Sequence, residues 1–124
     1  MARITMRLES RDLRRLQRQL NEVPEDVQRG AKEAVAESAE TVRKQVERTV
    51  RVWRGKLKDR VRVREIGAGL TADVGWFDDD TYYAQFQEFG TSSIEADPVL
   101  TTAAEEERAR FVDRVRREVR EELG

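Results

Sequence analysis

The side chains that could do chemistry in this chain are carboxylates, arginines and aromatics, because it contains no cysteine and no histidine. Their absence excludes disulfides, a thiol nucleophile, a Cys/His zinc site and an imidazole base. The 25 acidic residues among 124 are too many for spacing alone to indicate a catalytic pair. No nucleophile–base pair can be proposed, so an enzyme is the weakest interpretation and no cofactor is expected.

Three consecutive carboxylates, Asp78, Asp79 and Asp80, could in principle hold Mg²⁺ or Ca²⁺. Their spacing does not match an EF-hand loop, and no downstream Glu occupies the matching position. We interpret them as a solvated loop and expect no metal site. The stretch 67–69 has only two glycines and reads as a turn, not as a phosphate-binding loop.

Positive charge is concentrated at Arg60, Arg62 and Arg64, which follow further Lys and Arg residues between 51 and 58. These arginines could face DNA phosphates, in contacts that ignore base sequence and weaken with salt. Alternatively, Asp73 and acids of a neighbouring subunit compensate the charge, and the arginines protect an edge strand. The sequence leaves both interpretations open.

The chain has a single aromatic cluster, which ends at Gly90 and Thr91 and comprises Tyr82, Tyr83, Phe86 and Phe89. Gly90 can supply a turn with positive φ. We expect Phe86 and Phe89 to anchor this bend in the core, with direct contact at an interface as the alternative. Glu88 is expected to bond either the backbone or an Arg across a subunit contact, and the alternative is a solvated carboxylate. Strand and helical turn both remain possible for this stretch.

Two elements of the N-terminal half follow from hydrophobic periodicity. Residues 4–8 alternate apolar and charged or polar side chains, which predicts a half-buried strand, and leucines at helical spacing predict a short helix ending near Asn21. A longer helix is predicted from Pro24 to Val52, with a narrow Ala/Val stripe that continues to Trp53.

That helix would be about 43 Å long, whereas a compact domain of this size is about 35 Å across. We therefore expect it to overhang its own domain or to pack against another copy. A kink near Gly30 is the alternative.

A hairpin is predicted from two alternating stretches, Arg60–Glu65 and Leu70–Trp76. A tight turn at residues 67–68 would place Val63 opposite Ala72, Val61 opposite Val74 and Arg62 opposite Asp73.

A final helix is expected to begin near Asp97-Pro98 or at a capping box, Thr102 to Glu105, and to bury Phe111. Together these elements indicate one α+β domain over residues 1–124, with a small antiparallel sheet on a long amphipathic helix and a C-terminal helix. We find no signal peptide and no membrane span, so a soluble, non-secreted protein is expected.

One stretch also carries a family resemblance. The run Tyr83-Ala84-x-x-x-Glu88-Phe89-Gly90-Thr91, followed by a polar loop, Ala96-x-Pro98 and a helix, resembles the signature of phage proteins that complete the tail. These are the tail-completion and head–tail joining proteins of long-tailed bacteriophages. The predicted order of elements is similar too. One departure is Val99-Leu100, which stands where the family usually has an aromatic after the proline.

The resemblance implies a non-enzymatic ring of six copies in the virion neck, assembled in the host cytoplasm and letting the tail dock on the DNA-filled head. Its partners would be connector or stopper proteins and the tail-tube protein, with possible non-specific DNA contact at Arg60, Arg62 and Arg64, and no membrane or small-molecule substrate. The candidate interface residues are Tyr83, Phe86, Glu88, Phe89, Gly90, Thr91 and Pro98. The alternatives are a capsid-side adaptor or stopper ring and, in another class, a small nucleic-acid-binding regulatory protein.

Overall fold

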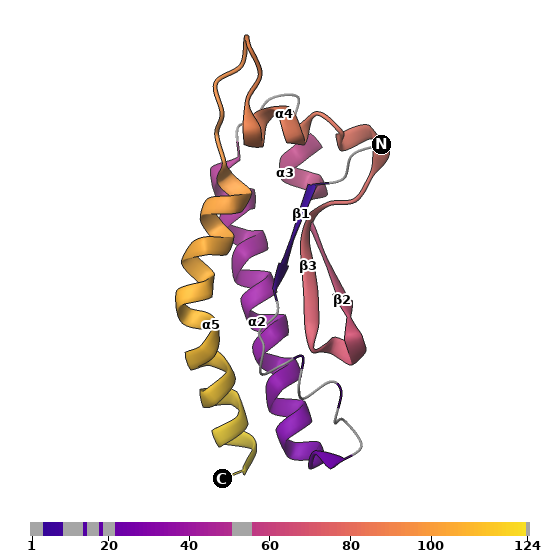
Figure 1. Ribbon diagram of the computed structural model, residues 1–124, viewed down its shortest axis with the longest axis vertical. Coiled ribbons are helices and arrows are strands. Elements are labelled where there is room, and N and C mark those ends of the chain that lie inside the picture. The colour runs from indigo at the N-terminus through magenta and orange to yellow at the C-terminus, as the bar shows by residue number, and fades with distance from the viewer. Residues whose placement is uncertain (1–3, 9–13, 15–17, 19–21, 51–55, 124) are drawn as a thin grey trace.

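The computed structural model describes residues 4–8, 14, 18, 22–50 and 56–123. It confirms the α+β fold class: a three-stranded antiparallel sheet packs beside two long helices (Figure 1). Most of the short helix predicted to end near Asn21, and the stripe position at Trp53, lie outside the described residues. No helix in the described part of the chain is long and apolar enough to cross a membrane.

The sheet has the strand order β1-β3-β2, with β1 at Ile4–Leu8, β2 at Arg62–Ile66 and β3 at Thr71–Trp76. Met6, Val74 and Val63 lie in line across the three strands. Because side chains alternate along a strand, this row shares the face on which Ala72 and Trp76 are buried. The strand predicted at residues 4–8 is confirmed, and the strand order places it at one edge of the sheet.

The predicted hairpin forms, but its register differs by two residues from the expected one. Val63 pairs with Val74, and Arg64, not Arg62, stands opposite Asp73. The reason is the turn: Gly67–Gly69 forms a short 3-10 helix in which Gly67 and Gly69 have positive φ, and Leu70 belongs to the turn. A shift of two residues keeps each side chain on its predicted face.

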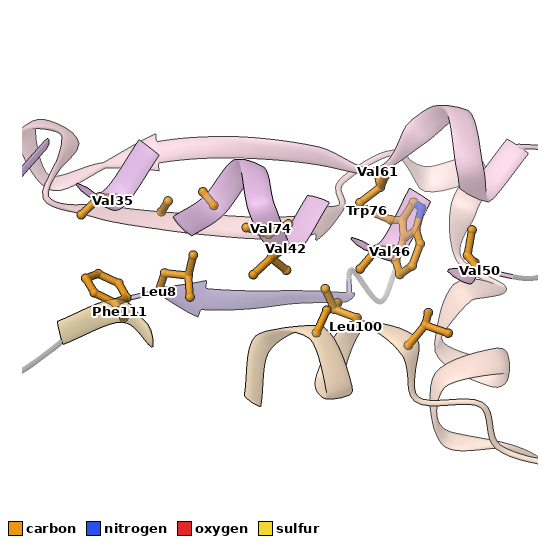
Figure 2. Close-up of a cluster of buried hydrophobic side chains, with 14 of the residues drawn as sticks. Leu8, Val35, Val42, Val46, Val50, Val61, Val74, Trp76, Leu100 and Phe111 are labelled. Atoms are coloured by element: carbon orange, nitrogen blue, oxygen red, sulfur yellow. The ribbon is translucent and has the colours of Figure 1, made fainter. Parts of the chain in front are cut away.

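The two long helices are α2, Glu25–Thr49, and α5, Val99–Leu123, and they run antiparallel against each other (Figure 1). The apolar stripe of α2 is buried in the core by α5 and the sheet. Figure 2 shows it facing both, and its members include Ala31, Val35, Ala39, Val42 and Val46. This stripe is therefore covered within the chain and does not need another copy to cover it.

The two helices approach closely at Gly30, since a Cβ there would lie 2.7 Å from the Val119 Cα. The helix continues through Gly30 without interruption. This glycine therefore permits close packing against α5, and the alternative of a kink at this position is not needed. Polar contacts also join the pair: Ser38 Oγ donates to buried Glu107 at 2.6 Å, and Arg114 binds both Glu107 and Glu37. Hydrogen bonds from Arg117 are the main cause of the lowered pKa of Glu37.

Candidate subunit interface

The aromatic bend forms a short helix, α4, at Ala84–Phe89, which settles the choice between strand and helical turn. It lies at one end of the molecule, beside α3 (Lys56–Arg60). The loop between α4 and α5 projects beyond it (Figure 1). Leu57 of α3 and Ala84 of α4 belong to the hydrophobic core, whereas Tyr82, Phe86 and Phe89 at the same end are exposed.

The prediction that Phe86 and Phe89 anchor the bend in the core is wrong, because their side chains are 37% and 70% exposed. Helical geometry explains this: Ala84, Gln87 and Glu88 share the face that is buried, and the two phenylalanines lie off it. The open alternative, that they contact an interface, stays a prediction.

Other residues of the bend divide between core and surface. Tyr83 packs against the core while remaining partly accessible. Tyr82, which sequence reasoning left without a role, is 47% exposed and meets Tyr83 and Phe86 edge-to-face at 6.0 and 6.2 Å. The only sequence feature that could have drawn attention to Tyr82 is its position in the aromatic cluster.

Glu88 holds the first turn of α5. Its side chain is 3% exposed, Oε1 accepts the N–H of Leu100 at 3.0 Å, and Oε2 accepts that of Thr101 at 2.7 Å. These donors have no partner inside the helix, and a carboxylate is also favoured by the helix dipole. The predicted backbone bond is confirmed within one chain, and the solvated alternative is wrong.

Gly90 turns the chain as predicted, with φ +77°. A Cβ there would meet the Ala96 backbone nitrogen at 2.9 Å and the Ile94 carbonyl oxygen at 3.0 Å, so the loop closes tightly over this residue.

Thr91 fastens the loop tip: its N–H donates to the Ile94 carbonyl at 2.8 Å, and its Oγ1 accepts the N–H groups of Ser93 and Ile94. Farther along, the Asp97 N–H donates to the Gln87 carbonyl at 2.7 Å. The loop is thus braced within itself and against α4 while residues 91–93 remain exposed.

Pro98 begins the last helix, because its carbonyl accepts the Thr102 N–H at 2.9 Å. This confirms the first of the two predicted starts. Val99 and Leu100, which replace the family's usual aromatic, are buried in the core, so they pack inward and leave Pro98 exposed.

The arginines at the start of the hairpin do not act as one face. Arg60 donates to Asp78 at 3.1 Å and Asp80 at 3.2 Å, contacts that raise its pKa and that give the acidic loop a structural role. The carboxylate of Asp73 binds Arg7 of β1, whereas one of the two open interpretations had it compensate the hairpin arginines.

Arg62 and Arg64, which remain exposed on β2, are engaged differently. Arg62 donates to the carbonyl of Asp59, and Arg64 stacks over the ring of Phe77 at 4.6 Å.

A comparison with protein families identifies this chain. The sequence profile described as "Bacteriophage HK97-gp10, putative tail-component" matches residues 14–90, well over half of the chain and up to the Gly90 turn. Neither the curated proteins nor the solved structures compared with the chain include a match. The match agrees with the resemblance to tail-completion proteins. The chain therefore belongs to the HK97-gp10-like family of bacteriophage tail components.

Proposed function

We propose that this tail component is a structural virion protein that forms a ring at the head–tail junction and lets the tail dock on the DNA-filled head. The observation that carries the proposal is Phe89, an aromatic side chain 70% exposed beside a loop that is closed by its own hydrogen bonds. Phe89 follows exposed Phe86 by about one helical turn, and Phe86 contacts exposed Tyr82. Exposed apolar side chains that lie together mark an interaction site. A braced loop also loses little conformational entropy on binding.

In this proposal identical copies cover the aromatic end, each chain acting as a single tail-completion-like domain. A contact between two different surfaces of identical copies closes into a ring when the rotation permits. The proposed ring has six copies, sits in the neck between connector or stopper proteins and the tail tube, assembles in the host cytoplasm, and performs no catalysis. A capsid-side adaptor or stopper ring is the rival within this class, and the position of the protein in a particle map separates the two.

DNA contact in the ring channel is supported only by Arg62 and Arg64. Both are exposed, and neither has a carboxylate partner within the described residues, whereas Arg60 is engaged by Asp78 and Asp80. The competing role as a nucleic-acid-binding regulator predicts salt-dependent binding of duplex DNA by the isolated protein. Absence of binding at low salt would dismiss that role.

The test is Phe89→Ala in the phage genome, with Val112→Ala as the matched control. Val112 is also an exposed apolar residue, 48% accessible, but it lies on α5 outside the aromatic end. We expect Phe89→Ala to give filled heads and separate tails that fail to join, seen by electron microscopy, while Val112→Ala joins normally. Normal infectious yield from Phe89→Ala would refute the proposed role of this surface.

A further inference from the structure

Charge is divided along the chain in a way that the overall balance hides. Residues 43–64 contain ten basic and two acidic residues, whereas residues 65–107 contain eleven acidic residues and no lysine or arginine. The first segment supplies the end of α2, α3 and β2, and the second supplies β3, α4, the projecting loop and the start of α5. In Figure 1 the projecting loop and β2 lie at separate places on the molecule.

The basic strand surface, which we define as Lys58, Arg62, Arg64 and Phe77, can receive an anion. All three cations are exposed, and none has a carboxylate partner in the part of the chain that the structure describes. The side-chain hydrogen bonds of Arg62 go to backbone carbonyls. The guanidinium carbon of Arg64 lies 4.6 Å from the centroid of the Phe77 ring, a cation–π contact that leaves its N–H donors without a carboxylate partner in the described part of the chain.

The projecting loop, residues 89–97, has the complementary character. Phe89 is exposed at its base, and Glu95 is exposed near its tip and has no ion-pair partner among the described residues. The loop contains no basic residue that could neutralise Glu95. Its internal bonds to Thr91 and the turn at Gly90 brace the backbone that carries both side chains.

We propose that the projecting loop of one copy docks on the basic strand surface of the next copy, an inference that rests on the proposed ring. Glu95 would pair with Arg62 or Arg64, since a guanidinium and a carboxylate can form two parallel hydrogen bonds. Phe89 would cover the adjoining Arg64–Phe77 stack. Because the two surfaces differ, each copy gives one loop and receives one, which is the head-to-tail arrangement that closes into rings.

The first test reverses charge on each side. Arg62→Glu with Arg64→Glu, or Glu95→Arg alone, should weaken self-association roughly tenfold or more, because like charges then face each other. Combining all three changes should restore it. Arg116→Glu with Arg120→Glu is the control, since it makes the same change of charge on exposed positions of α5. Sedimentation equilibrium measures association, and circular dichroism checks folding.

The second test establishes head-to-tail geometry. Phe89→Asp disables the projecting loop, and Arg62→Glu with Arg64→Glu disables the basic strand surface. In a mixture of the two variants, only the intact loop of one can dock on the intact strand surface of the other. The mixture should therefore stop at one-to-one dimers. If wild-type protein forms rings and the Arg62/Arg64 variant forms them equally well, the inference is overturned while the ring proposal stands. A wild-type protein that stays monomeric at high concentration overturns both.

Discussion

A buried carboxylate beside a helix N-terminus stabilises the fold only while its oxygens accept hydrogen bonds, and Glu88 meets that condition twice. Glu88→Ala should lower the free energy of unfolding by about 1–3 kcal/mol, because two backbone N–H groups lose their acceptor. Urea unfolding measures the loss. Glu95→Ala is the control, since this exposed carboxylate should change stability by less than about 0.5 kcal/mol. Equal stability of the two variants would contradict the capping role.

At this scale the sequence predicts a residue's role where its type allows few conformations or few partners. Gly90 could be predicted because few other residues tolerate its turn, and Glu88 because a backbone donor was one of two stated partners. The orientation of Phe86 and Phe89 could not be predicted while strand and helix stayed open. Once the stretch is a helix, residues 84, 87 and 88 lie on its buried face. Which face is buried depends on how the helix packs against α5.

Among the elements, the α2–α5 pair determines where the projecting loop is placed, and Gly30 sets how closely its helices approach. Gly30→Ala should gain up to about 1 kcal/mol of helix propensity. It should nevertheless destabilise the protein, because its Cβ would lie within 3 Å of the Val119 backbone and forcing extra atoms into a packed contact costs about 1–3 kcal/mol. Thermal unfolding checks the sign. Glu33→Ala, at an exposed position of the same helix, should be near neutral, and a more stable Gly30→Ala would refute the close packing.

Periodicity was sufficient to predict the elements and their buried faces, but not how they pair. The Ala/Val stripe on α2 and the burial of Phe111 on α5 could be predicted from the sequence, yet nothing local shows that one helix covers the other. The hairpin illustrates the same limit. Alternation of Val61 and Val63 with arginines fixed the faces, while the register depended on a turn that took in Leu70 as well as the glycines.

At the scale of the whole molecule, nearly equal numbers of acids and bases conceal a basic segment, residues 43–64, and an acidic segment, residues 65–107. Counting charges could not reveal them, because their meaning depends on which charges are already engaged within the chain. Arg60 is engaged by Asp78 and Asp80, whereas Arg62, Arg64 and Glu95 have no partner of opposite charge among the described residues. Assembly should therefore respond to solution conditions that hardly affect folding.

Salt provides that test. The Debye length shortens from about 10 Å at 0.1 M salt to about 3 Å at 1 M, so exposed pairs between copies should weaken as salt rises. We expect the association constant to fall about three- to tenfold from 0.05 to 0.5 M NaCl, while the urea midpoint changes little because the core is mostly apolar. In Glu95→Gln the salt dependence should be smaller, since the loop then carries no charge to pair with Arg62 or Arg64. Association that tightens with salt in both proteins would show that Phe89 holds the contact without the charges.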